Sequence, residues 1–207
     1  MDEAVHTVLG DLVGSRSLPD RAAVHGRLTE ALDEVNEVLH PVLPFATTVG
    51  DEYQGACADL TQAVLAGLLV RLALLPDADA RCGIGHGPVT VYDASRRPPL
   101  QDGPGWWTAR EAIEVIGAPR ETRRTWFVGA EEDDAERTAL LNAFLVCRDQ
   151  LVDRLNERGT RMLRHALLGR TQKEIAELEG VWPSAVSQQF SRGVGAVVQA
   201  QRLIARP

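Results

Sequence analysis

The chain has 207 residues, 44% of them hydrophobic, and a formal net charge of −7. This composition is that of a globular protein and argues against wholesale disorder. No apolar run reaches the ~18 residues of a membrane span, and the first residues, MDEAVH, are acidic, so we expect neither a membrane span nor a signal peptide. Three cysteines without a Cys-x-x-Cys pair favour reduced thiols in a cytoplasmic protein.

Charge is divided unevenly along the chain. Residues 151–207 contain nine Lys or Arg and five Asp or Glu, a balance of +4. The other 13 basic and 24 acidic residues leave −11 for residues 1–150. A basic segment on an acidic body indicates two roles, one of them near a polyanion, although chance in a short segment gives the same balance.

The first part of the chain predicts a strand, a helix and a hairpin. Residues 5–13 (VHTVLGDLV) have the pattern of a short buried strand, and apolar residues spaced by three and four predict a helix over residues 21–39. Two short apolar runs, 45–49 and 53–58, are separated only by Gly-Asp-Glu, and we interpret them as a hairpin with a tight turn.

The following elements continue the alternation. Residues 60–75 predict an apolar helix too short to cross a bilayer, and residues 80–92 predict a strand that contains glycines. A proline- and glycine-rich loop is expected over 93–105, then a helix over 106–116 and a strand over 125–129. The order β-α-β-β-α-β-α-β predicts an α+β fold: a ferredoxin-like core with one added strand, antiparallel elements and helices on one face.

The remainder is predicted to be helical. Few helix-breaking residues occur from residue 133 to about residue 168, and Gly159 is expected to divide this region into two helices. Short helices follow. We place a domain boundary between residues 131 and 132, so that residues 1–131 form the α+β domain and 132–207 an all-α domain.

The most distinctive short motif of the chain is GRTQKEIAELEGVWPSAVSQQFSRG (169–193), which contains a helix-capping pattern. Thr171 followed by Glu174 is a capping box and predicts a helix start. Gly180 stands where a positive φ would end that helix, and Pro183 suits the first turn of a second helix because its missing N–H is not needed there. The segment therefore predicts two short helices joined by a tight turn.

This residue pattern resembles the helix-turn-helix of bacterial repressors and sigma factors. A generic helical hairpin is the alternative interpretation. Those motifs carry an apolar residue at the position of Glu179 in this chain. Either the side chain of Glu179 points outward, or the turn has a different geometry. On the resemblance, the second helix offers hydroxyl, amide and guanidinium groups to the base edges and phosphates of double-stranded DNA. The implied DNA-binding residues are Thr171, Gln172, Pro183, Ser184, Ser187, Gln188 and Arg192.

Two Gly-Asp pairs lie beside apolar runs, in HTVLGDLVGSR (6–16) and TTVGDEYQGAC (47–57). Asp11 or Asp51 taken alone is explained as a turn residue. Two carboxylates at the ends of buried strands instead favour a shared partner. A divalent cation is a natural one, because Mg²⁺ binds one or two carboxylates together with phosphate oxygens.

The same segments resemble a known family. LGDLVGSR and TTVGDEYQG are similar to the two metal-binding strands of class III nucleotide cyclase domains, and RCGIGHGPVTV is similar to a later strand of that domain. Diguanylate cyclases share the fold and a related Gly-Asp-Glu hairpin. The SatD-like family of small bacterial proteins is a narrower match, through GD-x-x-x-SR, GDEYQG, R-x-G-x-G and a DGPG…AR-x-A block. These patterns cover about residues 5–130.

The resemblance implies a metal and nucleotide site. Asp11 and Asp51 would hold Mg²⁺ or Mn²⁺, with the carbonyl of Leu12 as a third ligand. The loop Val13-Gly14-Ser15-Arg16 would present N–H groups and a guanidinium to the phosphates of a nucleotide. Arg110 would bind phosphate as well, from the neighbouring subunit of a dimer.

Other residues near this site have weaker roles or depart from the family pattern. Glu52 alternates to the opposite face from Asp51, and Trp106 and Trp107 are expected in the core or a dimer contact rather than stacked on a base. Cyclases select the purine with a lysine where this chain has Thr47, and their late-helix asparagine is missing from the segment 108–110. There is no GGDEF signature. Nucleotide binding therefore survives these losses more readily than cyclisation does.

Three functions follow from these patterns. The first is a DNA-binding transcription regulator, acting as a homodimer, whose cyclase-like domain binds a nucleotide or nucleotide second messenger and thereby alters DNA affinity. The second is a Mg-dependent nucleotidyl cyclase or nucleotide-cleaving enzyme with a regulatory helix-turn-helix. The third is a ligand-free dimerisation module on a DNA-binding protein.

Overall fold

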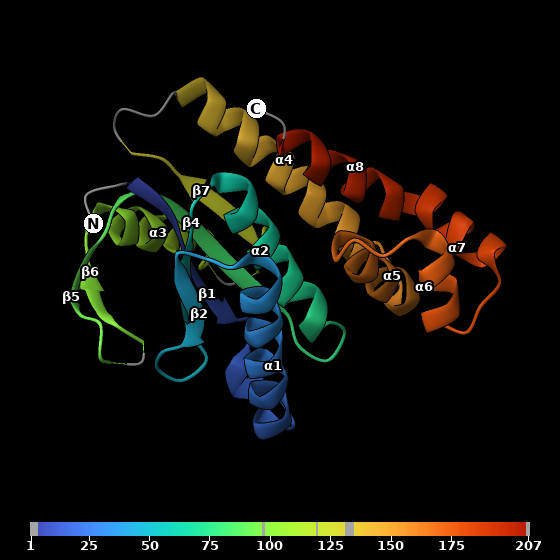
Figure 1. Ribbon diagram of the computed structural model, residues 1–207, viewed down its shortest axis with the longest axis horizontal. Helices are drawn as coiled ribbons and strands as arrows, with labels where there is room; N and C mark the ends of the chain where they lie inside the picture. Colours follow the sequence, from blue (N-terminus) through green and yellow to red (C-terminus); the bar gives the residue numbers. More distant parts are fainter. Residues whose placement is uncertain (1–3, 97, 119, 131–134, 206–207) are drawn as a thin grey trace.

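A five-stranded sheet in the order β2-β3-β1-β4-β7 lies at the centre of the fold (Figure 1). The structure is a computed structural model and describes residues 4–96, 98–118, 120–130 and 135–205. The sheet strands are β1 (Ala4–Leu12), β2 (Leu43–Thr47), β3 (Tyr53–Cys57), β4 (Ala80–Pro88) and β7 (Thr125–Val128). The helices are α1 (Arg21–Leu39), α2 (Leu60–Leu74), α3 (Pro104–Val115), α4 (Ala135–Asp153), α5 (Glu157–Leu167), α6 (Gln172–Leu178), α7 (Pro183–Gln189) and α8 (Gly195–Ile204), with short helical turns η1 (Ser15–Ser17) and η2 (Phe190–Val194).

Strand β1 pairs antiparallel with both β3 and β4, and β2 pairs antiparallel with β3. Strand β7 lies parallel to β4 at the other edge of the sheet. The order β2-β3-β1-β4 is that of a ferredoxin-like core, and β7 is the added strand. The predicted α+β class is therefore confirmed. The expected boundary between residues 131 and 132 falls outside the described residues.

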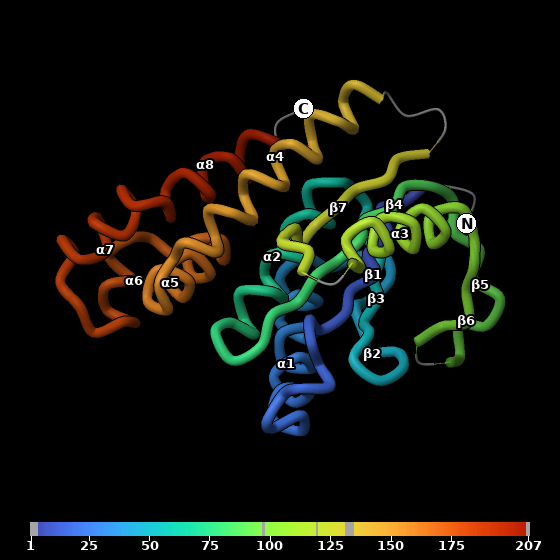
Figure 2. The backbone as a smooth tube through the Cα atoms, turned by 180° about the vertical axis from the view of Figure 1, so that it is seen from behind, coloured from blue at the N-terminus to red at the C-terminus, as the bar shows by residue number. Residues whose placement is uncertain are grey.

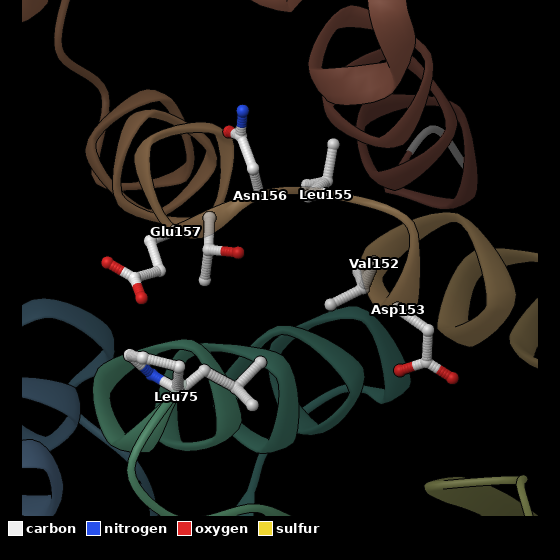
Figure 3. Close-up of a pocket in the computed structure, with 8 residues that line it drawn as sticks. Leu75, Val152, Asp153, Leu155, Asn156 and Glu157 are labelled. Atoms are coloured by element: carbon white, nitrogen blue, oxygen red, sulfur yellow. The ribbon is translucent and has the colours of Figure 1, made fainter.

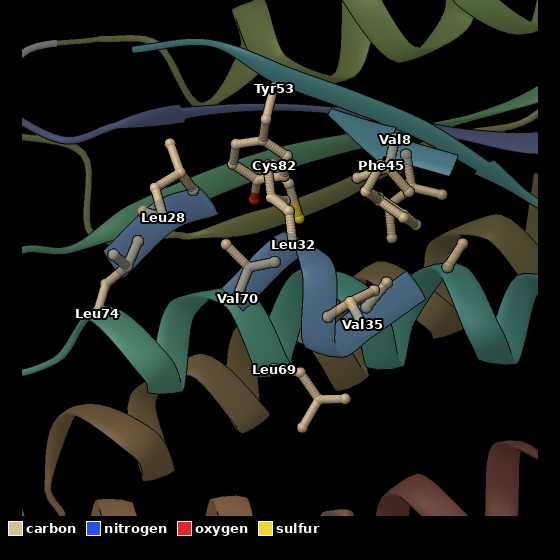
Figure 4. Packing of buried hydrophobic residues seen from close by; sticks show 14 of the residues in the cluster. Val8, Leu28, Leu32, Val35, Phe45, Tyr53, Leu69, Val70, Leu74 and Cys82 are labelled. Atoms are coloured by element: carbon tan, nitrogen blue, oxygen red, sulfur yellow. The ribbon is translucent and has the colours of Figure 1, made fainter. Parts of the chain in front are cut away.

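Helices α1 and α2 cover one face of the sheet. Val8 and Leu12 of β1 point to this face, because successive side chains alternate along a strand. They share a hydrophobic cluster with Tyr53 and Cys82 of the neighbouring strands (Figure 4). The helix residues of this cluster include Val24, Leu28, Leu32 and Val35 of α1 and Val64, Leu69, Val70 and Leu74 of α2. The apolar spacing read from the sequence thus becomes the buried face of each helix.

Helix α3 packs on the opposite face, so the prediction that the helices lie on one face is wrong. Gly83 and Gly85 of β4 face this helix. A Cβ at Gly85 would lie 2.3 Å from the backbone nitrogen of Ala109, and one at Gly83 would lie 2.3 Å from that of Ile113. The glycines of β4 therefore let a helix approach the sheet at backbone distance.

The region after β4 also differs from the prediction. Instead of one strand to residue 92 and a loop to residue 105, β4 ends at Pro88 and a separate hairpin follows, formed by β5 (Thr90–Asp93) and β6 (Leu100–Asp102). Proline has no N–H with which to extend the pairing of β4. The hairpin lies on the side of the sheet away from α4–α8, as the two opposite views show (Figures 1 and 2).

Helix α4 covers the open edge of β7 and satisfies its backbone. The Asn142 side chain accepts a hydrogen bond from the N–H of Phe127 and donates one to its carbonyl, both at 2.9 Å. One oxygen of Asp149 accepts from the N–H groups of Arg124 and Thr125 at 2.9 and 2.8 Å. Two polar side chains, two helical turns apart, thus take the place of a further strand and protect the edge.

The long helical region divides at Asn156 and not at Gly159. Helix α4 ends at Asp153, and the Asn156 side chain caps α5 by accepting a hydrogen bond from the N–H of Gly159 at 2.8 Å. Gly159 lies buried inside α5. The predicted break is therefore wrong by three residues, because a capping asparagine defines the helix start more strongly than a glycine interrupts a helix.

Helix α2 also connects the sheet to the C-terminal helices. Its residues Leu68 and Leu72 belong to a second hydrophobic cluster. The other buried members of that cluster come from α4–α8 and η2, and they are Val152, Met162, Leu163, Ala166, Ile175, Ala176, Val186, Val194, Val197 and Val198. Within the described part of the chain, no helix has both the length and the apolar character needed to cross a membrane.

Candidate functional site

The antiparallel register brings the first predicted acid to the end of the sheet where the β2–β3 turn lies. Asp11 is the next-to-last residue of β1 and is paired with Arg81 of β4. On the other side of β1, Gly10 is paired with Tyr53, the first residue of β3. The turn that carries Asp51 and Glu52 therefore lies beside Asp11.

Arg81 makes a bidentate ion pair with Asp11. Its Nε donates to Asp11 Oδ1 at 2.7 Å and its Nη2 donates to Oδ2 at 2.9 Å. The remaining Nη1 donates to the carbonyl of Ile116, at the end of α3, at 3.0 Å. Both side chains are about one-fifth exposed. The hydrogen bonds to Asp11, aided by the charges of Asp11 and Asp51, raise the pKa of Arg81 above its ordinary value.

Helix α3 supplies a second arginine to this end of the sheet. Arg110 Nη2 lies 3.7 Å from Glu52 Oε2, and both side chains are about half exposed. Glu52 thus faces α3, whereas the acidic charges that act on Arg81 are those of Asp11 and Asp51.

The predicted phosphate loop forms a tight turn directly after Asp11. Gly14 has φ 65° and ψ 27°, in the left-handed region that glycine adopts without strain. Its carbonyl accepts hydrogen bonds from the backbone and the hydroxyl of Ser17, at 2.9 and 2.8 Å. Arg16 is exposed, and the N–H of Val13 is occupied by the carbonyl of Asp79 at 2.8 Å. The long helix α1 begins only at Arg21, so its N-terminus does not follow this loop directly.

The donor types at this edge fit a divalent cation, but their arrangement does not leave them free. Two carboxylates, Asp11 and Asp51, and the carbonyl of Leu12 are hard oxygen donors of the kind that Mg²⁺ prefers. Both oxygens of Asp11, however, accept hydrogen bonds from Arg81. In the described residues, no group of three or more His, Cys, Asp or Glu side chains is arranged to hold a metal.

The two tryptophans of α3 have different surroundings. Trp106 is buried and belongs to the hydrophobic cluster between α3 and the sheet, as expected for a core residue. Trp107 is 61% exposed, and its Nε1 donates to Asp102 Oδ1 at 2.8 Å.

A family comparison covers both the sheet and the C-terminal helices. The sequence pattern of the SatD family matches residues 5–202. The chain belongs to the SatD family. This match spans nearly all of the SatD-family chain, from β1 to α8, and so includes the segments with the two Gly-Asp pairs and the C-terminal helices.

Solved nucleotide cyclase domains are similar to this SatD-family chain at a low level. The guanylate cyclase domain of RhGC from Catenaria anguillulae, in complex with GTP, is 19% identical over 55% of this chain and 74% of that one, with a TM-score of 0.45. A bacterial light-regulated adenylyl cyclase is 12% identical over 60% and 76%, with a TM-score of 0.47. The guanylyl cyclase Cya2 is 17% identical over 55% and 70%, with a TM-score of 0.42. These values are too low to assign an activity. No curated protein matches the chain.

The two short helices expected at residues 169–193 are present in the SatD-family chain. Helix α6 starts with the predicted capping box between Thr171 and Glu174. Gly180 has φ 62° in the turn, and Pro183 is the first residue of α7. Val186 of α7 is fully buried. The residues proposed from the sequence to contact DNA are all exposed: Thr171, Gln172, Pro183, Ser184, Ser187, Gln188 and Arg192. Their DNA-binding role stays a prediction.

Glu179 points inward, so of the two alternatives given for it the outward side chain does not hold. Its side chain is only 6% exposed and accepts hydrogen bonds from Arg161 of α5, from Nε at 3.0 Å and from Nη2 at 2.8 Å. His165 Nε2 lies 3.6 Å away. The hydrogen bonds from Arg161 hold the pKa of Glu179 below its ordinary value. An acid is tolerated at this inward position because α5 supplies the compensating charge.

Two grooves lie apart from the Asp11 site. One is formed where the end of α2 meets the connection between α4 and α5, and the carboxylates of Asp153 and Glu157 stand on its rim (Figure 3). Its other lining residues are Leu75, Pro76, Val152, Leu155, Asn156 and Thr160. The second lies between α6 and α8 and includes Gln172 and Arg202. Only Gln172 in these grooves was predicted as a site residue.

Arg81 is not among the site residues predicted from the sequence. Its segment, RCGIGHGPVTV, predicts a strand, but the sequence assigns no partner to the arginine. The residue opposite Asp11 is set by the register of β1 with β4, which pairs segments about 70 residues apart. A register of this kind depends on both strands and on the faces they bury.

Proposed function

We propose that this chain is a DNA-binding regulator whose sheet domain binds a nucleotide or nucleotide second messenger. The observation that carries the proposal is the arrangement of α7. Val186 holds this helix in the second hydrophobic cluster, while Ser184, Ser187 and Gln188 face solvent. A short helix anchored on one face and polar on the other is what a major groove accepts.

Charge around α7 favours a polyanion. Arg170, Lys173 and Arg192 are exposed and take part in no ion pair among the residues that the structure describes. The charge of the nearby Glu179 is offset by its pair with Arg161, whereas Glu174 is hydrogen-bonded in the capping box and stays ionised. Free cations beside a polar helix supply the sequence-independent part of DNA affinity.

Gln188→Ala and Ser187→Ala are expected to weaken binding to a specific DNA site by about 1–3 kcal/mol for each hydrogen bond to a base that the substitution removes. The measurement is fluorescence anisotropy at fixed salt, with DNA selected from a random pool by the full chain. Gln199→Ala is the matched control, because Gln199 is an exposed glutamine on α8 rather than α7. Parental binding by both α7 variants would show that α7 does not read the bases.

The nucleotide part of the proposal rests on the charges at the end of the sheet. Arg81, Arg110 and Arg16 offer guanidinium groups that match phosphate geometry. The turn Val13-Gly14-Ser15 begins two residues after Asp11, the partner of Arg81, and leads into Arg16. A divalent cation bound with the nucleotide would be held by Asp11, Asp51 and the carbonyl of Leu12, and it would neutralise phosphate charge.

A nucleotide that binds this site is expected to raise the melting temperature of the full chain, by an amount equivalent to about 2.7 kcal/mol at 100 times its Kd. Differential scanning fluorimetry with nucleoside triphosphates and cyclic nucleotides, each with Mg²⁺, tests this. Arg110→Met should reduce the shift. Arg27→Met is the control, since Arg27 pairs with the exposed Asp77 elsewhere on the surface.

The outcomes separate the three functions. No shift with any nucleotide favours a ligand-free dimerisation module. Turnover of a nucleoside triphosphate that is abolished by Asp11→Asn favours the enzyme. A shift without turnover, together with DNA binding that responds to the same nucleotide, supports the regulator. The homodimer expected for a helix-turn-helix protein stays part of this proposal.

A further inference from the structure

We propose that Arg81 controls the entry of a divalent cation into this site: it occupies Asp11 until a polyphosphate draws the guanidinium away, so that the cation binds with the nucleotide and not before it. This inference rests on the proposed nucleotide site. It concerns the order of binding, which the family resemblance does not address.

The ion pair with Arg81 uses both carboxylate oxygens of Asp11. A single hydrogen bond would leave one carboxylate oxygen for a metal, but Arg81 donates to both, at 2.7 and 2.9 Å. A cation at Asp11 would also be repelled by the guanidinium, and this repulsion is stronger at a partly buried edge than in bulk water. In the absence of phosphate, the guanidinium of Arg81 therefore already neutralises the carboxylate of Asp11.

A phosphate is available as a better partner for Arg81. The planar fork of a guanidinium binds phosphate in the same two-point geometry as carboxylate. The pair is about one-fifth exposed, so a phosphate chain can reach it. The third contact, from Nη1 to the carbonyl of Ile116, keeps the guanidinium beside α3 when the contact with Asp11 opens.

Two negative charges, those of Asp11 and Asp51, remain at the site once Arg81 binds a phosphate. Asp51 lies close enough to contribute to the electrostatic environment of Arg81. When Arg81 turns to a phosphate, Asp11 and Asp51 are two carboxylates without their counter-ion. Such a pair next to phosphate oxygens is the setting in which Mg²⁺ binds. The same residues thus reject the metal alone and accept it with the nucleotide.

The test is a titration of the full chain with Mn²⁺ alone. The electron paramagnetic resonance signal of the free ion measures how much Mn²⁺ remains unbound. The parent protein should bind Mn²⁺ weakly, and Arg81→Met should bind it at least about tenfold more tightly, which corresponds to ~1.4 kcal/mol. Adding Asp11→Asn to Arg81→Met should remove the gain. Arg27→Met should behave as the parent, because its ion pair lies outside the site.

Two results would overturn the proposal: Mn²⁺ binding by the parent as tight as by Arg81→Met, or a gain that persists without Asp11. If Arg81→Met does not fold, Arg81→Lys decides, since lysine keeps the charge but loses the two-point contact and should give a smaller gain. A gain in Arg81→Met with no nucleotide-induced stabilisation of the parent keeps the role of Arg81 in excluding the metal and rejects the nucleotide function. If the parent binds nucleotide but Arg81→Met binds Mn²⁺ no more tightly than the parent, Arg81 only neutralises Asp11 and does not control the entry of the metal.

Discussion

Asp149→Ala is expected to lower the free energy of unfolding by about 3–5 kcal/mol, because it leaves a buried charge without its partner. Asp149 and Arg148 are each 1% exposed, and Arg148 Nη2 donates to Asp149 Oδ1 at 2.8 Å. The other carboxylate oxygen accepts from the N–H groups of Arg124 and Thr125. The substitution therefore removes a counter-ion and the cap of the β7 edge together. Urea unfolding followed by circular dichroism measures the loss.

Asp77→Ala is the matched control. Asp77 is 66% exposed and pairs with Arg27 at 2.5 Å on the surface. Exposed ion pairs contribute about 0–1 kcal/mol, so this variant should unfold almost as the parent does. Equal losses in the two aspartate variants would mean that the buried pair is not a main support of the fold.

The charges around Asp149 also reach the candidate site. Asp79 accepts hydrogen bonds from Arg71 at 2.7 Å and from Arg124 at 2.6 Å, and Arg71 also binds Asp153 of α4. The carbonyl of Asp79 accepts from Val13, in the loop after Asp11. Burial of Asp79 raises its pKa, but the hydrogen bonds from Arg71 and Arg124 outweigh this and lower it overall. A continuous set of hydrogen bonds thus connects α4 to the predicted phosphate loop.

Gly85→Ala is expected to destabilise the chain by about 3 kcal/mol, at the upper end of the range for overpacking. The added Cβ would lie 2.3 Å from the backbone nitrogen of Ala109 and 2.4 Å from the carbonyl oxygen of Gly105. Both are backbone atoms of α3, so no side chain can rotate away. The helix must move from the sheet, and the residues that it buries, including Trp106 and Ile113, are exposed in part.

Gly26→Ala provides a control of opposite sign. Gly26 lies within α1, and a Cβ there meets nothing within 4 Å. Alanine in a helix interior is favoured over glycine by roughly 0.5–1 kcal/mol, so this variant should be slightly more stable than the parent. Thermal unfolding of both glycine variants tests the pair. A Gly85→Ala protein that melts with the parent would show that α3 is not held against β4 at backbone distance.

Elements with a strong local pattern could be predicted from the sequence to within a residue or two. The helix expected over residues 21–39 is α1, and the helix expected over 60–75 is α2. Regular apolar spacing and side-chain caps at Asp20 and Asp59 explain this accuracy. The hairpin β5–β6 was missed because its strands are only four and three residues long and half exposed, which leaves little hydrophobic alternation.

The candidate site could be predicted only in part. The sequence pairs Asp11 with Asp51 as neighbouring acids, and the register places the turn that carries Asp51 beside Asp11. A metal at Asp11 stays a prediction, and the structure adds Arg81, which forms an ion pair with Asp11. For Glu179 the sequence left two alternatives, an outward side chain or an adjusted turn, and the side chain lies inside because Arg161 of α5 pairs with it. In both cases the decisive partner is distant in sequence.

The sequence by itself determined the local elements and the residue types at the two candidate sites, since helix caps, apolar spacing and glycine turns act between neighbours in the chain. Only the tertiary structure decided which charge meets which. Arg81 reaches Asp11 through strand register, and Asp149 meets the edge of β7 through the docking of α4. The energy of a charge depends on its burial and its partner, and neither is defined until the chain has packed.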